Sequence, residues 1–211
     1  DALRGAGRLC ESLGHDVEEV ACPFSARLVD DFLAYWGLVA WLQVRAGRML
    51  MHRGFDASRV EPWTTGIAAT FPANRAGTAA SVWRLRGFAR TYAALMETCD
   101  VVLNMVTADV APPLGALAPD VPFETAFERL RTWLPVTGYW NTAGAPAMSL
   151  PLGRSRAGLP IGVQLGAARG NDRLLLGLAS ALEAAQPWPR VAPRELWLRD
   201  PVSEAPTTSA R

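Results

Sequence analysis

The sequence predicts an α/β fold, in which part of a mixed, twisted sheet is covered by helices. A helical pattern at residues 2–13 precedes a strand-like alternation at residues 15–21. Long helical patterns fill residues 26–98, and short apolar runs bounded by turn residues follow them. Helical and strand periods that alternate along one chain are typical of a sheet packed against helices.

The N-terminal unit is expected to be a helix, a glycine turn and a strand. Apolar residues recur at helical spacing over residues 2–13, and Gly14 suits the end of that helix. Residues 15–21 then place Val17 and Val20 among charged residues, which predicts a short strand.

The middle of the chain is expected to be helical. Residues 26–52 have a broad apolar face, Pro62 begins a short helix over residues 62–69, and residues 78–98 have one apolar side. These helices would form a hairpin packed on the sheet. The stretch before residue 78 contains residues that interrupt helices: Gly66, Pro72, Asn74 and Gly77.

The remaining strands are expected in the C-terminal part. Residues 101–106 are apolar except for Asn104, which predicts a buried strand. Residues 122–134 predict a helix. Residues 147–152 and 161–165 predict two strands that pair as a hairpin or as neighbours, because a polar, glycine-rich turn separates them.

A last helix is expected to begin at Asn171-Asp172, whose side chains suit a helix start, and to run to Gln186. The residues beyond position 200 are small and polar. We therefore predict one domain over residues 1–200 and a disordered tail over residues 201–211.

Composition excludes several classes of partner. The net charge is +1, so the chain lacks the basic surface typical of nucleic-acid binding. The most apolar stretch, residues 32–44, is shorter than the 20 or so residues that span a bilayer, so no membrane association is expected. Three cysteines form an odd, sparse set, which favours a reducing compartment and a cytoplasmic location.

The sequence offers no complete catalytic or metal-binding constellation. All 21 basic residues are arginines, so the chain has no lysine to act as a base or nucleophile. Neither His15 nor His52 lies beside a nucleophile elbow of the Gly-x-Ser-x-Gly type. Cys10, His15 and Cys22 do not have the spacing of zinc ligands. We therefore expect no catalytic residue, no metal and no cofactor in this chain.

Five of the eight tryptophans divide into two groups by their surroundings. Trp140 comes directly before a glycine- and proline-containing segment, at an expected junction of loop and strand, so it could belong to the core or face a pocket. The others stand in apolar helical patterns and are expected in the core: Trp36, Trp41, Trp83 and Trp133.

Two motifs identify a family resemblance. The first is Asn141-Thr142-Ala143-Gly144-Ala145-Pro146-Ala147-Met148-Ser149-Leu150-Pro151, and the second is Gly158-Leu159-Pro160-Ile161-Gly162-Val163-Gln164. With the Leu13-Gly14-His15 unit and the strand and proline loop at residues 100–115, they resemble the C-terminal portion of the amidase signature family, across residues 2–190. This family includes bacterial amidases and cyclic-oligoamide hydrolases.

The resemblance implies a carbon–nitrogen hydrolase that acts on linear carboxamides through an acyl-serine intermediate. The family uses a lysine, a bridging serine and a nucleophilic serine, and none of these motifs occurs here. This chain alone is therefore expected to be inactive, and to bind an amide substrate only together with an N-terminal half. Residues 104–106 stand where the family has Thr-Pro-Thr. The resemblance therefore does not indicate which class of amide the protein accepts.

The expected contribution of this chain is a wall of the substrate pocket. The candidate substrate-binding residues are Asn104, Thr107, Trp140 and Asn141; the alternative for Asn141 is a structural hydrogen bond to the backbone. Three origins fit the chain: a fragment of an amidase, which we favour, a non-catalytic remnant, or a partner of a separate N-terminal chain. As the alternative function, a binding or scaffolding module would use its exposed sheet edge to pair with another chain, or with itself as a homodimer.

Overall fold

The computed structural model describes residues 1–22, 24–25, 27–134 and 136–189, which form seven α-helices, one short 3₁₀ helix and three strands. In chain order the elements are α1 (Ala2–Ser12), α2 (Arg27–Leu50), η1 (Ala57–Arg59), α3 (Pro62–Ala73), α4 (Arg75–Leu95), β1 (Val101–Met105), α5 (Phe123–Trp133), α6 (Gly138–Ala143), β2 (Ala147–Arg154), β3 (Pro160–Ala167) and α7 (Asp172–Ala185). The α/β class predicted from the sequence is confirmed.

The three strands form an antiparallel sheet in the order β1-β3-β2. Strands β2 and β3 are the predicted hairpin, and a bulge lies between Leu150 and Gly153. The buried strand predicted at residues 101–106 is β1, which pairs with the other side of β3. Strand β3 is therefore the centre of the sheet.

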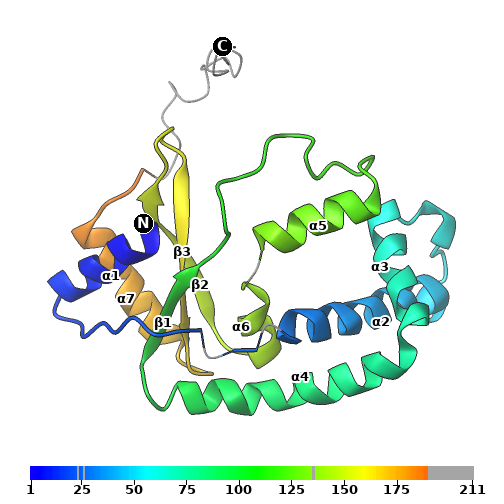
Figure 1. Ribbon diagram of the computed structural model, residues 1–211, viewed down its shortest axis with the longest axis horizontal. Coiled ribbons are helices and arrows are strands. Elements are labelled where there is room, and N and C mark those ends of the chain that lie inside the picture. The colour runs from blue at the N-terminus through cyan, green and yellow to red at the C-terminus, as the bar shows by residue number, and fades with distance from the viewer. Residues whose placement is uncertain (23, 26, 135, 190–211) are drawn as a thin grey trace, which may run out of the picture.

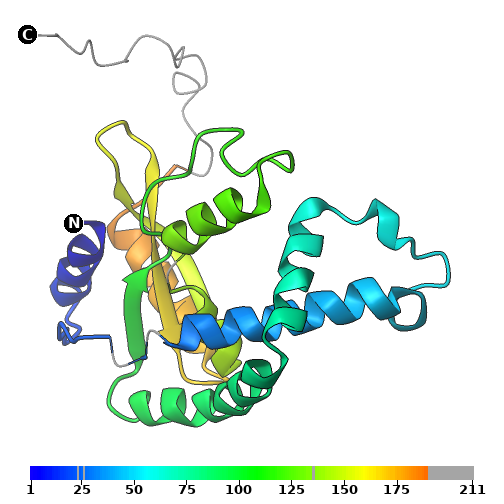
Figure 2. The same cartoon turned by 45° about the vertical axis from the view of Figure 1, so that its right-hand side comes forward.

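Helices cover both faces of the sheet. Helices α1 and α7 lie against one face, and the longer helices lie on the other side, with α6 nearest the strands (Figure 1). The view in Figure 2 shows the same division, with α2 and α4 extending away from the sheet toward α3. Over the C-terminal half of β3, the side chains on both faces of the sheet are buried. Such a strand requires a covering layer on each face.

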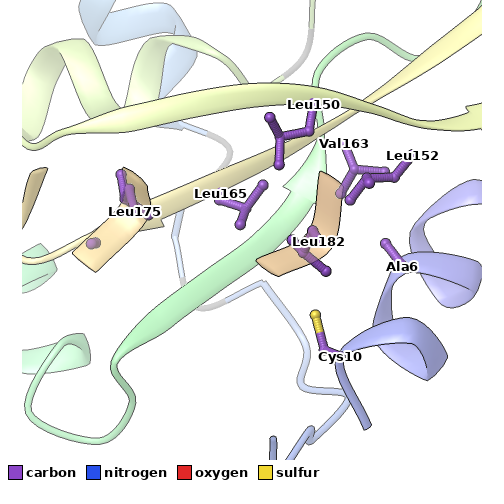
Figure 3. Close-up of a cluster of buried hydrophobic side chains, with 9 residues drawn as sticks. Ala6, Cys10, Leu150, Leu152, Val163, Leu165, Leu175 and Leu182 are labelled. Atoms are coloured by element: carbon purple, nitrogen blue, oxygen red, sulfur yellow. The ribbon is translucent and has the colours of Figure 1, made fainter. Parts of the chain in front are cut away.

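The core between the sheet and helices α1 and α7 is aliphatic. Leu165 from β3 and Leu182 from α7 are completely buried, and Cys10 of α1 lies beside them (Figure 3). Burying side chains of this size contributes about 1.5–3 kcal/mol each to folding, so this cluster holds α1 and α7 on the sheet. Its other buried members are Ala6, Leu150, Leu152, Val163, Ala167 and Leu175.

The opposite face of the sheet packs against aromatic side chains. Val102 of β1 contacts a cluster built from α2, α4 and α6, whose buried members are Leu28, Phe88, Tyr92, Tyr139, Trp140 and Ala143. A third cluster joins α2 to α3 and contains Ala40, Ile67 and Ala68. The tryptophans Trp36 and Trp41 pack partly buried against this third cluster.

The predicted N-terminal strand at residues 15–21 is wrong. Helix α1 ends as expected, with Gly14 at φ +88° and the His15 N–H bonded to the Cys10 carbonyl. Residues 15–22 then run without strand pairing. Val17 packs on the aliphatic core, but Val20 is 63% exposed. Of the two alternating valines, only Val17 thus attaches this irregular segment to the core.

Three further details of the helical part differ from the predictions. Helices α3 and α4 run on both sides of one interruption at Asn74, and Gly66, Pro72 and Gly77 lie within helices. Trp83 is 77% exposed and does not belong to the core. Helix α6 was not predicted, because its six residues are too few to show a helical period.

Residues 190–211 lie outside the described residues, so the predicted domain end at residue 200 and the polar tail at residues 201–211 stay predictions. Across the described part of the chain, no helix has the length and apolar character needed to cross a bilayer.

An ion pair joins the two longest helices. Asp31 of α2 is 4% exposed, and the Arg84 guanidinium of α4 donates two hydrogen bonds to its carboxylate, one of them 2.7 Å long. The Arg84 hydrogen bonds hold the pKa of Asp31 below its usual range, and a bond from Ser81 adds to this effect. Because charge-assisted bidentate pairs have defined geometry, this contact fixes how α2 crosses α4.

We predict that Asp31→Asn destabilises the chain at neutral pH and that the difference from wild type shrinks in acid. The lowered pKa in the folded state means that the ionised carboxylate contributes stability above the unfolded pKa of about 3.9, and that this contribution is lost as pH falls through the folded value. Urea unfolding at pH 7, 5 and 3 measures this. Asp30→Asn is the control, because Asp30 is exposed and pairs only with Arg131 at the surface. An Asp31→Asn effect that is equal at all three pH values would contradict the prediction.

Candidate functional site

A pocket of about 360 Å³ lies between helices α2, α5 and α6. Its walls are mainly apolar side chains of α2 and α5, with Leu134 just beyond α5. Pockets of this size and character hold the apolar part of a small molecule, with a few polar groups to orient it. The apolar wall consists of Leu28, Val29, Phe32, Leu33, Trp36, Phe127, Leu130 and Leu134.

The polar groups of the pocket come from α6 and from the end of α5. Asn141 lines the pocket and has an exposed side chain, with no hydrogen bond to any described residue. Thr142 also lines it, but its hydroxyl donates to the Gly138 carbonyl at 2.8 Å. Arg131 pairs with Asp30 across the pocket rim at 3.3 Å, with both side chains about half exposed or more. Asn141 can therefore bond a ligand without losing a protein partner, and so can Thr137, which also lines the pocket and whose hydroxyl bonds no described residue.

Trp140 faces away from this pocket. The sequence placed it at a junction of loop and strand, whereas the structure places it in α6, where it is 3% exposed and packs on the sheet. Its Nε1 atom lies where a side chain at Gly166 would begin, 1.5 Å from the ideal Cβ position. Only glycine at position 166 allows the indole to approach β3 so closely.

Asn104 lies on the same face of the sheet as Trp140. It is paired with Gln164 across β1 and β3, and Gln164 is paired with Ser149 across β3 and β2. The side-chain carbonyl oxygens of Asn104 and Gln164 are buried and have no hydrogen-bond donor from the described residues. Gln164 was not among the predicted site residues, although it is a polar residue in an otherwise apolar strand, with Gly162 and Gly166 two positions away on either side.

Thr107 lies in the loop after β1 and does not line the pocket. Its hydroxyl donates to the Asp109 carbonyl at 2.7 Å, which closes a local turn. Of the four predicted site residues, the structure thus brings Asn104 and Trp140 to one face of the sheet. It places Asn141 in the pocket and Thr107 in a separate loop.

A tyrosine connects α4 to the end of β3 near Trp140. The Tyr92 hydroxyl donates to the Ala167 carbonyl at 3.0 Å, and its ring meets the indole of Trp140 nearly edge-on. Burial raises the pKa of Tyr92 to about 12, and the neighbouring Trp140 N–H offsets part of that effect. Tyr92 therefore stays protonated at neutral pH and acts as a structural donor.

Two of the three cysteines have thiols of low reactivity. Burial raises the pKa of the Cys10 and Cys99 thiols, so both are poor nucleophiles at neutral pH. Within the ranges that the structure describes, no three His, Cys, Asp or Glu side chains gather as metal ligands would.

Comparison with known proteins identifies the family. The family model described as Amidase matches residues 1–176, which is most of the chain. The chain belongs to the amidase family.

Curated relatives within the amidase family match nearly the whole chain. “Putative amidase AmiC” of Mycobacterium bovis is 42% identical over 190 residues, covering 90% of this chain and 40% of the relative. The 6-aminohexanoate-cyclic-dimer hydrolase of a Pseudomonas species is 31% identical over 199 residues, covering 89% of this chain and 40% of the relative. The chain thus spans about 40% of the length of these amidase-family relatives.

Solved structures of the amidase family have the same fold. The complex of 6-aminohexanoate cyclic dimer hydrolase with its substrate matches with a TM-score of 0.75 and 31% identity, over 92% of this chain and 42% of that one. A bacterial aryl acylamidase of the amidase signature enzymes matches with a TM-score of 0.64, and at 20% identity it supports the fold alone.

We predict that Gly166→Ala displaces Trp140 and destabilises the chain by about 1–3 kcal/mol, because the new methyl group would overlap the indole. Chemical denaturation measures the loss. Gly87→Ala is the matched control: its new methyl group meets only Arg90 at 3.8 Å within a helix, so it should be neutral or stabilise by up to about 1 kcal/mol. Equal stability of the two variants would show that Trp140 is not held against β3.

Proposed function

We propose that this chain is the C-terminal portion of an amidase that hydrolyses linear carboxamides through an acyl-serine intermediate and releases ammonia or an amine. The observation that carries the proposal is the family match over residues 1–176 by a chain that spans about 40% of its relatives and contains no lysine. One relative is named as a hydrolase of the cyclic dimer of 6-aminohexanoate.

The chemistry of amide hydrolysis indicates which groups the rest of the amidase would have to supply. A serine hydroxyl attacks a carboxamide only when a base removes its proton, and hydrogen-bond donors must stabilise the oxyanion that forms. The described residues form no nucleophile and base of this kind, and the sequence has no lysine. We therefore assign the catalytic groups to the portion of the amidase that precedes this chain, and no catalysis to this chain alone.

This chain would supply the wall that receives the substrate. The pocket between α2, α5 and α6 is apolar on most sides and suits a hydrocarbon or aromatic portion of an amide. Asn141 can hydrogen-bond the substrate's amide or another polar group at the same time. None of the candidates Asn104, Thr107 and Trp140 lines the pocket. Their role would be indirect: Asn104 and Trp140 would support the wall from the sheet, and Thr107 would do so from the loop after β1.

We place the amidase in the cytoplasm. The three cysteines are all free thiols, one exposed, one buried and one between these extremes, which suits a reducing compartment.

The first test is catalytic activity with and without the proposed N-terminal portion. We predict turnover of simple aliphatic and aryl amides by the protein encoded by the whole reading frame, and none by the 211-residue chain. Ammonia or amine release measures both. Turnover by the chain alone that is lost on substitution of one of its own residues would contradict the proposal.

A second candidate function is a binding or scaffolding module that pairs with another chain or with itself. The observation that favours it is the strand order β1-β3-β2, because the outer sides of β1 and β2 have no partner strand among the described residues and could pair with another chain. Sizing of the chain with and without the separately produced N-terminal portion separates the two proposals. A stable homodimer that ignores the added portion would favour the module, and a one-to-one complex that gains amidase activity would favour the amidase.

The second test concerns the pocket. We predict that Asn141→Ala in the active protein raises KM about tenfold with a smaller change in kcat, because one substrate hydrogen bond of roughly 1.4 kcal/mol is lost in binding. Thr142→Val is the control, since this side chain lines the same pocket but its hydroxyl is already bonded to Gly138. Steady-state kinetics on one aryl amide compare the two variants. If Thr142→Val raises KM as much as Asn141→Ala, the assigned role of Asn141 is wrong.

A further inference from the structure

The two outer strands of the sheet differ in how well their free edges are protected. The order β1-β3-β2 leaves one side of β1 and one side of β2 without a partner strand among the described residues (Figure 2). A free strand edge presents a row of N–H and C=O groups, and proteins normally protect it with proline, a bulge, charged side chains or a covering segment. These features therefore distinguish an edge that ends a sheet from an edge that continues it.

The free edge of β2 has three such features. Pro151 has no N–H to donate, and a bulge interrupts the strand between Leu150 and Gly153. From the end of α7, the Gln186 side chain donates a hydrogen bond to the Leu152 carbonyl at 3.2 Å. Strand β2 therefore has the properties of a strand that ends a sheet.

The pairing register shows toward which neighbour each residue of β3 directs its backbone groups. In an antiparallel ladder these groups alternate between the two sides of the strand. The Ala167 N–H bonds to the Pro146 carbonyl, so Ala167 directs its N–H toward the β2 side. By alternation, Gln164 and Gly166 direct their backbone groups toward β1.

The free edge of β1 consequently consists of groups from alternate residues. Val102 and Asn104 are the register partners of Gly166 and Gln164, so their backbone groups point to β3. The other residues of β1 point their N–H and C=O groups outward, where no described residue bonds them. These outward residues are Val101, Leu103 and Met105.

This edge has none of the features that protect β2. Strand β1 has no proline, no charged residue and no bulge, and its 5 residues are an ordinary length for a strand. The connection at residues 15–22 makes no strand pairing with it. Its apolar run is typical of a strand inside a larger sheet, yet its residues are only partly buried, and Met105 is 42% exposed.

We propose that the outer edge of β1 pairs with an extended strand from the portion of the protein that precedes this chain, so that the sheet continues across β1 and ends at β2. This step rests on the proposed function, which assigns the catalytic groups to that portion. The chain spans about 40% of the length of its relatives, so the remaining length is ample to supply a strand.

Two arguments favour this occupant. Helices cover both faces of the sheet, so the sheet can be extended only at its edges, where main-chain hydrogen bonds supply the affinity. A segment of the same polypeptide has a high effective concentration at this edge, which gives it an advantage over a second copy of the chain.

The direct test is amide hydrogen exchange, measured residue by residue in the 211-residue chain and in the protein encoded by the whole reading frame. We expect the outward amides of Leu103 and Met105 to exchange about 100-fold more slowly in the whole protein, because a ladder hydrogen bond then protects them. The amides of Val102 and Asn104 are the internal control. They bond to β3 and should be protected in both proteins.

Three results would overturn the proposal. Protection gained at the outward amide of Ser149 would show that the sheet continues at β2. Equal exchange of the Leu103 and Met105 amides in the two proteins would show that no strand adds to β1. Protection of these amides in the chain alone, rising with its concentration, would identify a second copy as the occupant.

The second test is a proline at each free edge. Met105→Pro removes an outward N–H and no bond to β3, so the midpoint of thermal unfolding of the 211-residue chain should change by less than about 2 °C. In the whole protein it should fall by about 4 °C or more, because the added strand loses a ladder bond. Ser149→Pro is the matched change at β2 and should have a small effect in both proteins. Equal losses from the two variants in the whole protein would contradict the proposal.

These results also separate the strand pairing from the proposed function. Amide turnover by the whole protein without added protection at β1 would refute the strand pairing alone. Protection at β1 in a whole protein that hydrolyses no amide would support the strand pairing and refute the function.

Discussion

The burial of strand β3 on both faces is the constraint on which the other elements depend. One face requires apolar side chains, which Val163, Leu165 and Ala167 supply against α1 and α7. The other face alternates Gly162, Gln164 and Gly166, and it accepts an aromatic helix at close range. A strand with this sequence suits the centre of the sheet, where β1 and β2 pair with its two sides and helices cover both of its faces.

The two faces of the sheet therefore have different properties. The aliphatic face is a simple core that tolerates volume-conserving exchanges. On the aromatic face, the ring of Trp140 takes the place of a side chain at position 166, and its neighbours include Tyr92 and Tyr139. This packing places α6 between the sheet and the pocket. The pocket wall is consequently connected to the sheet through one short helix, while α2 and α5 form the opposite side.

The sequence predicted the elements whose patterns are long or whose turns are marked. Helices α2, α4 and α7, the β2–β3 hairpin and the strand β1 all follow from periodicity and from turn residues. The strand expected at residues 15–21 failed because two valines in alternation do not require a pairing partner. Helix α6 could not be predicted, because its packing against Gly166 is a tertiary contact that no local pattern records.

The candidate site was predicted only in part, because tertiary contacts decide which residues line it. Asn141 was identified as a wall residue from its motif, and it does line the pocket. The eight apolar side chains of that wall were not identified, since in the sequence they look like ordinary core positions of amphipathic helices. Gln164 was read as part of a family motif, and only the register of β1 and β3 shows that it faces Asn104.

The order of the strands also has a consequence for the time course of folding. Strands β2 and β3 are joined by a short turn and can pair early, whereas β1 reaches β3 only after the intervening chain, which contains α5 and α6, has closed into a long loop. The contact from Tyr92 to Ala167 spans a similar separation, 75 residues. We therefore expect the hairpin to nucleate the sheet, and the pocket to be among the last parts of the molecule to assemble, since α5 and α6 lie inside the loop that β1 closes and α2 lies far earlier in the chain.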